Sequence, residues 1–152
     1  FGPRDFCLKT EDGEELACAH SLWVYVDTET GRPVKPSEEE IRVYEVEEPL
    51  PMESASRKIQ APEAMQVVDT FTVHKYHIDT NNHMNNAKYI ELACEALPED
   101  FDVTGLRVEY KKAAIYGETM ILKRAMQENV LTTVLCDEQN QVYAIVKFIG
   151  EN

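Results

Sequence analysis

The sequence predicts an α+β fold in which an antiparallel β-sheet wraps around one central helix. One segment, residues 85–97, repeats apolar residues at helical spacing, whereas the segments around it are rich in β-branched and aromatic residues. The strand-like segments after it are joined by connections of only a few residues. Such short connections cannot hold parallel crossovers, so they favour an antiparallel meander.

The composition indicates a folded, acidic protein that is not expected to bind polyanions. Of its 152 residues 43% are hydrophobic, and 15 Lys and Arg against 28 Asp and Glu give a net charge of -13, which disfavours nucleic acid and anionic membranes as partners. No apolar run reaches the roughly 18 residues of a membrane-spanning helix. The four cysteines lack a close CxxC pairing and lie among apolar residues, as reduced buried thiols do. We therefore expect a cytoplasmic protein.

The first 44 residues predict a hairpin and a short helix. Strands are expected at 4–9 and 15–27, joined by a turn at Asp12-Gly13. Ser37 followed by three glutamates resembles the capped, acidic first turn of a helix.

Residues 45–63 are expected to form an extended linker, because Pro49, Pro51 and Pro62 lie there among charged and small residues. We place a domain boundary in this segment. It divides the chain into residues 1–44, the linker, and a second domain at 64–152.

The second domain is predicted to hold one strand, one helix and four further strands. The first strand covers 67–74, and the helix buries a stripe made of Ile90, Ala93, Cys94 and Leu97. Asn85 or Asn86 can cap its start, and Pro98 follows its end. The later strands are expected at 103–113, 117–127, 129–136 and 141–149. The last strand is apolar on both faces, so we expect a second sheet, from a partner subunit or a second copy of the domain, against its outer face.

Polar side chains that can perform acyl hydrolysis gather just before this helix. Asp79 is a candidate general base, His83 can accept or orient a proton, and Asn81 can donate an amide hydrogen. Free backbone amides at Asn85 and Asn86 would face an oxyanion at the helix start. The simpler interpretation is an Asn-rich turn that only caps a helix. A metal site built from His74, His77 and His83 matches no known ligand spacing, so no metal or other cofactor is expected.

The segment at 79–89 reads Asp79-Thr80-Asn81-Asn82-His83-Met84-Asn85-Asn86-Ala87-Lys88-Tyr89. It resembles a signature of plant and bacterial acyl-acyl-carrier-protein (acyl-ACP) thioesterases, Asp-x-Asn-x-His-x-Asn-Asn-x-Lys-Tyr. All seven fixed positions of this eleven-residue signature are present. Similarity extends to Arg4-Asp5-Phe6, Leu22-Trp23-Val24 and Val108-Glu109-Tyr110-Lys111-Lys112. The resemblance implies two tandem hot-dog domains. Residues 1–44 would then be the closing strands of a partial first domain, and the chain an N-terminally incomplete member.

The resemblance also implies a function and a catalytic set. The expected activity is hydrolysis of fatty acyl-ACP, with release of the free fatty acid, and the expected partner is the carrier protein. Asp79, Asn81 and His83 match the catalytic Asp, Asn and His of the family. Plant members carry a Glu-Cys pair where this chain has Ala113-Ala114, so we expect direct attack by water rather than by a cysteine. Either Asp79 or His83 could be the base.

Two further expectations concern partners. The carrier is acidic and needs a local basic surface, for which Lys88, Lys111 and Lys112 are candidates, although each could equally be a solvated surface residue. A homodimer would be one way to cover exposed apolar edges. Two other functions stay open: a single-domain acyl-coenzyme A thioesterase and a non-catalytic acyl-binding module.

Overall fold

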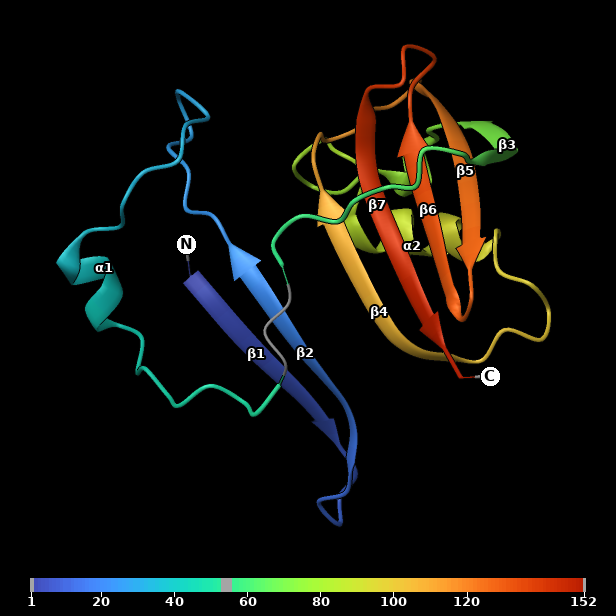
Figure 1. Ribbon diagram of the computed structural model, residues 1–152. Coiled ribbons are helices and arrows are strands. Elements are labelled where there is room, and N and C mark those ends of the chain that lie inside the picture. The colour runs from blue at the N-terminus through green and yellow to red at the C-terminus, as the bar shows by residue number, and fades with distance from the viewer. Residues whose placement is uncertain (1, 53–55, 152) are drawn as a thin grey trace. The chain divides into compact units, whose positions relative to one another are not determined.

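The computed structural model describes residues 2–52 and 56–151, which form two compact units (Figure 1). One unit precedes Ser56 and the other begins there. None of the helices in the described residues is long and apolar enough to cross a membrane.

The first unit is a hairpin followed by a short helix. Strand β1 (Gly2–Lys9) pairs antiparallel with β2 (Glu15–Trp23), and the turn between them uses Gly13 at a φ of 89°, where a side chain would be strained. Helix α1 (Glu38–Arg42) has the predicted capping box, with Ser37 as its N-cap. Strand β2 ends four residues earlier than predicted, because Asp27 instead organises a turn by accepting the backbone N–H of Thr30 at 2.7 Å.

The second unit is one sheet wrapped around one helix (Figure 1). All neighbouring strands are antiparallel, in the order β3-β5-β6-β7-β4. The strands are β3 (Gln66–Thr72), β4 (Val103–Tyr110), β5 (Thr119–Gln127), β6 (Val130–Cys136) and β7 (Val142–Gly150), with a 3-10 turn η1 (Lys75–His77) and helix α2 (Asn86–Cys94) between β3 and β4.

The predicted four-strand meander is wrong at its first step. Only β5, β6 and β7 follow one another, whereas β4 lies at the far edge of the sheet beside β7. The reason is that β3 takes the free edge of β5, so the only other edge open to β4 is that of β7. Residues 111–118 must therefore cross from one edge of the sheet to the other, and this crossing segment reaches the start of α2.

Helix α2 packs on one face of the sheet, and its predicted stripe is right at Ala93 and Leu97 but wrong at Cys94. Tyr89, Ala93 and Ala96 are buried in the main core, whereas Cys94 is exposed. Sequence periodicity chose the apolar Ile90 and Cys94 over Tyr89, because a tyrosine can be buried only where its hydroxyl finds a partner. That partner is supplied by the crossing segment, described below.

Part of the opposite face of the sheet is covered by the connecting segment. The second sheet that we expected there, from a partner subunit or a second copy of the domain, stays a prediction. Ile59 packs against Val134, Cys136 and Ile145 on this face, with Met65 against the same cluster. Figure 1 shows the segment before β3 running across β7, β6 and β5. Part of the predicted linker is therefore packed structure.

The cysteines differ from the buried thiols that we expected. Only Cys136 is buried, Cys7 is half-buried, and Cys18 and Cys94 are exposed. Residues next to a cysteine in a strand point to the opposite face, so apolar sequence neighbours do not show that the thiol is buried. Cys7 and Cys18 lie on the polar face of the hairpin.

Candidate functional site

The segment between η1 and α2 folds back on itself to form a tight loop. Ile78 and Met84 form an isolated antiparallel bridge, and the backbone N–H of Asp79 donates to the carbonyl of His83 at 2.9 Å. Asn82 occupies the tip with a φ of 59°, a left-handed conformation that asparagine tolerates better than most residues. The asparagine-rich composition therefore allows the chain to reverse between the strand and the helix.

Two backbone hydrogen bonds fix this loop to the rest of the unit. The N–H of Met84 donates to the carbonyl of Ala114 in the crossing segment at 2.8 Å, and the N–H of Asn85 donates to the carbonyl of His77 at 2.8 Å. Met84 is itself buried. The loop is therefore positioned from both sides, which suits a site that needs fixed geometry.

Asp79, Asn81 and His83 line one cavity of about 380 Å³. Asp79 is half-buried, whereas Asn81 and His83 are exposed. The structure thus brings together all three residues that the sequence singled out. The rest of the lining comes from the start of α2 and from the end of β4 and the crossing segment: Met84, Asn85, Asn86, Tyr89, Tyr110, Lys111, Lys112 and Ala113.

The carboxylate of Asp79 is held by its own loop. Its Oδ1 accepts the backbone N–H of Asn81 at 2.8 Å, a local turn that restricts the side chain. The same bond fixes the backbone of Asn81, the residue two positions on. The carboxylate of Asp79 and the backbone of Asn81 are therefore held together.

The start of α2 is partly closed by its own cap. Asn85 Oδ1 accepts the N–H of Ala87 at 2.9 Å, and the Asn85 carbonyl accepts the N–H of Lys88 at 2.9 Å. The N–H of Asn85 itself is paired with His77. Of the two residues that we expected to supply backbone amides, Asn85 thus uses its N–H to anchor the loop, whereas Asn86 is the first helical residue beyond the cap.

Two tyrosines that our sequence analysis did not assign also line the cavity. Tyr89 is 2% exposed, and its hydroxyl oxygen accepts the N–H of Ala114 at 2.8 Å. Tyr110 lies edge-on to it, with ring centroids 5.7 Å apart, and donates to the carbonyl of Asn86 at 3.0 Å. Burial raises the pKa of both hydroxyls, so both keep their protons near neutral pH. Tyr89 lies within the signature at 79–89, so the sequence could have identified it as a residue of the site.

Replacing Tyr89 with Phe is expected to lower the free energy of unfolding by about 1–3 kcal/mol, because the buried N–H of Ala114 loses its partner. Urea unfolding followed by circular dichroism measures this loss. The Tyr110→Phe variant is the matched control: Tyr110 as a whole is 42% exposed against 2% for Tyr89, so water can replace part of its hydrogen bonding and the loss should be smaller. Equal losses in the two variants would contradict the structural role of Tyr89.

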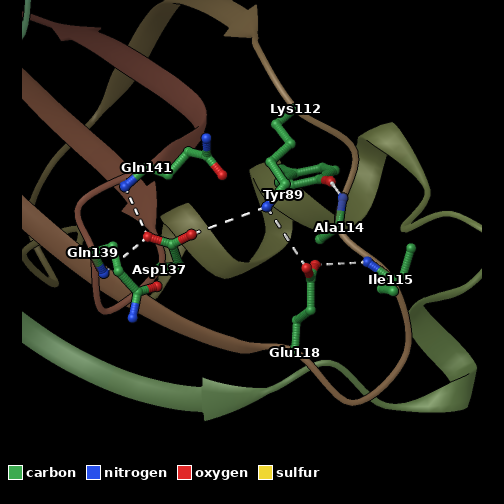
Figure 2. A network of polar contacts seen from close by, with 8 residues as sticks. All are labelled: Tyr89, Lys112, Ala114, Ile115, Glu118, Asp137, Gln139 and Gln141. Carbon is green, nitrogen blue, oxygen red and sulfur yellow. Dashed lines mark hydrogen bonds and ion pairs between the residues drawn. The ribbon is translucent and has the colours of Figure 1, made fainter.

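Ala113 and Ala114, the two residues that the sequence analysis compared with a Glu-Cys pair, lie at and next to the cavity lining. Ala113 lines the cavity and Ala114 is fully buried. Neither Glu109 nor Glu118 lines the cavity, so neither supplies a carboxylate in place of the missing glutamate. Glu109 accepts the N–H of Ile59 at 2.8 Å. Glu118 accepts the N–H of Ile115 at 2.9 Å, as Figure 2 shows.

The three candidate docking lysines each have an acidic partner. Lys88 pairs with Glu91 at 2.6 Å and Lys111 with Glu109 at 3.1 Å. Lys112 lies between Glu118 and Asp137, at 3.7 and 4.0 Å (Figure 2). Only Lys111 and Lys112 line the cavity.

His77 holds the loop of the site through its backbone carbonyl, and it is expected to make the stability of the folded protein depend on pH. It is buried, its Nδ1 accepts the N–H of His74 at 3.0 Å, and its carbonyl holds Asn85. Burial lowers the pKa of the His77 imidazole, with a further contribution from the nearby His74. The unfolded chain therefore binds this proton more tightly than the folded chain.

Stability should consequently fall as the pH is lowered through the ordinary histidine value of about 6.5, because a proton on Nδ1 displaces the N–H of His74. Urea unfolding at pH 8 and pH 5.5, compared between the wild type and His77→Gln, measures the effect. Glutamine can accept the same hydrogen bond without titrating, so the variant should lose much of the pH dependence. A His20→Gln variant, in the other unit, provides the control. An identical dependence in His77→Gln and wild type would contradict the prediction.

The fold described above is the hot-dog fold, an antiparallel sheet wrapped around a helix, with a polar cavity at the start of that helix. Residues 60–149 match the family model of the acyl-ACP thioesterase C-terminal domain. The match covers more than half of the chain, so this chain belongs to that family. A comparison with curated protein sequences gave no significant match.

Solved structures agree with this family. An acyl-ACP thioesterase from Bacteroides thetaiotaomicron superposes with a TM-score of 0.83 at 25% identity, over 98% of this chain and 62% of the other. The 12:0-ACP thioesterase from Umbellularia californica superposes with a TM-score of 0.79 over 98% of this chain and 60% of the other, and its 20% identity supports the fold alone. The chain thus spans about three fifths of the length of these relatives.

Proposed function

We propose that this chain hydrolyses the thioester of a fatty acyl-ACP, releasing the free fatty acid and ending its synthesis. The observation that carries the proposal is that Asp79, Asn81 and His83 line one cavity beside the start of α2. Family membership supports the reaction class, and the cavity supplies the acid, amide and imidazole that the reaction needs.

In the proposed mechanism, water attacks the acyl carbon directly. Asp79, oriented by its bond to the Asn81 backbone, accepts the proton of this water, and His83 assists or exchanges roles with it. The side-chain amide of Asn81 and the backbone N–H of Asn86 stabilise the oxyanion, while Asn85 holds the helix start in place. Ala113 and Ala114 offer neither a thiol nor a carboxylate, which favours water over a covalent acyl-enzyme.

We also propose that the carrier docks near the cavity mouth through Lys111 and Lys112, with Lys88 on the adjacent helix. Their present carboxylate partners are exposed or half-buried, and such ion pairs contribute little stability, so an acidic carrier can replace them at small cost. Within this proposal, residues 1–44 are the closing strands of a first hot-dog domain, supported by the β1–β2 hairpin, and 64–152 are the catalytic domain. A homodimer and a cytoplasmic location stay predictions.

A thiol-release assay tests the proposal. The chain is given the same acyl group on ACP and on coenzyme A, and free thiol is measured over time. Faster release from acyl-ACP is expected. Faster release from acyl-coenzyme A would instead indicate a coenzyme A thioesterase, and binding of acyl-ACP without release would indicate an acyl-binding module.

A further inference from the structure

The β1–β2 hairpin carries a row of directly opposed side chains on its polar face. The row consists of three cross-strand pairs: Asp5 with His20, Cys7 with Cys18, and Lys9 with Glu15. Asp5 and His20 are hydrogen-bonded at 2.6 Å, and Lys9 and Glu15 form an ion pair at 2.9 Å. The apolar residues Phe6 and Leu8 alternate with this row and therefore face the other side. The middle pair is thus a dithiol that lies between two polar cross-strand pairs.

The two thiols are placed where a disulfide can form without movement of the backbone. Cys7 and Cys18 are register partners in an antiparallel ladder, and their Sγ atoms are 2.8 Å apart. Directly opposed residues in such a ladder have Cα atoms about 4.5–5.5 Å apart. This range lies within the roughly 4.4–6.8 Å that disulfides span.

The pair is also open to a reagent. Cys18 is exposed and Cys7 half-buried. By contrast, Cys136 is buried in the sheet of the other unit, and Cys94, which is exposed on α2 of that unit, has only this buried cysteine in the same unit. Proximity and access therefore coincide only at Cys7 and Cys18.

We propose that Cys7 and Cys18 are a thiol–disulfide exchange site that forms a reversible cross-strand disulfide. The site belongs to a different compact unit from the Asp79 cavity and does not depend on the thioesterase activity. Its co-reactant is a small-molecule disulfide, such as oxidised glutathione.

The exchange proceeds in two balanced steps. The Cys18 thiolate, on the more exposed residue, attacks the small disulfide; a mixed disulfide forms and one small thiolate leaves. Cys7 then loses its proton and attacks Cys18 Sγ, which releases the second small thiolate. The protein loses two electrons and two protons, and the small disulfide is reduced to two thiols. The hydrogen bond with Cys18 raises the pKa of Cys7 to about 11, so Cys7 holds its proton during the first step.

The same cluster suits a metal ion less well. Cys7, Glu15 and Cys18 bring three ligand atoms close together, but a structural zinc site needs four. Glu15 is already paired with Lys9. Two sulfurs on one tetrahedral zinc would lie about 3.8 Å apart at the usual bond length, farther than the pair in this hairpin.

The test is a titration of free thiols in the whole chain. With a reductant, all four cysteines should react with a thiol reagent under denaturing conditions. After incubation with oxidised glutathione, we expect the loss of two thiols, a mass lower by two hydrogen atoms, and a single disulfide-linked peptide pair containing Cys7 and Cys18. Reduced glutathione in excess should restore all four thiols, with an unchanged circular dichroism spectrum throughout.

Variants serve as matched controls. Cys94→Ser should keep the disulfide, whereas Cys7→Ser and Cys18→Ser should each lose it, and Cys7→Ser should stop at the mixed disulfide on Cys18. The proposal is overturned if the wild type retains four thiols, if mapping joins other cysteines or two chains, or if Zn²⁺ binds stoichiometrically to the reduced pair and blocks oxidation. None of these readouts uses thioester hydrolysis, so failure here is distinguishable from failure of the proposed function.

Discussion

Replacing Asp79 with Asn is expected to lower the turnover of acyl-ACP by about a thousandfold, because the cavity loses its proposed proton acceptor. Asparagine keeps an oxygen at Oδ1, so it can still accept the N–H of Asn81 and preserve the loop. The effect should therefore appear in kcat, measured as thiol release at saturating substrate, with little change in unfolding free energy.

The matched control for this variant is Asp69→Asn in β3. The carboxylate of Asp69 also accepts a local backbone N–H, from Thr70 at 2.7 Å, but the residue does not line the cavity. Asp69→Asn should leave turnover unchanged. If Asp79→Asn were as active as Asp69→Asn, Asp79 could not be the base, and water activation would have to be assigned elsewhere.

Replacing His83 with Ala is expected to lower turnover about a hundredfold or more, because the cavity loses its imidazole. The side chain is exposed, and the loop uses only the His83 carbonyl, which accepts the N–H of Asp79. The folded structure should therefore be unaffected. The measurement is again thiol release, with His20→Ala, in the other unit, as the control; full activity in His83→Ala would remove this residue from the mechanism.

A second variant, His83→Gln, separates the two proposed roles of this side chain. Glutamine can hydrogen-bond to water or to Asp79, but it cannot take up a proton. If His83 only orients the water or the acid, His83→Gln should recover much of the turnover that His83→Ala loses. If His83 is the base, the two variants should be equally inactive.

The strands and the helix of the second unit could be predicted because their signals are local. Segments rich in β-branched and aromatic residues, joined by short connections, marked β5 to β7, and Asn85 and Pro98 bracketed α2. The order of strands in the sheet could not be predicted in the same way. The placement of β4 beside β7 depends on competition between edges, and an eight-residue connection is compatible with either neighbour.

Which side chains are buried also depended on contacts that the local sequence pattern does not show. Periodicity pointed to Cys94 on α2, yet the buried residue is Tyr89, because Ala114 in a distant segment supplies an N–H for its hydroxyl. On the outer face of the sheet, Ile59 from the proline-rich connection covers part of the apolar surface, which the local pattern of that connection did not indicate. Both outcomes depend on contacts between residues far apart in the sequence.

The sequence by itself determined which residues of the site lie together, since Asp79, Asn81 and His83 fall within five positions of one asparagine-rich loop that can reverse only in a few ways. Tertiary structure alone decided what completes that site and what faces solvent. The crossing segment brings Tyr110, Lys111, Lys112 and Ala113 to the cavity, and strand pairing brings Cys7 against Cys18. These juxtapositions come from strand register and edge pairing, which depend on long-range hydrogen bonds that a local pattern of residues does not encode.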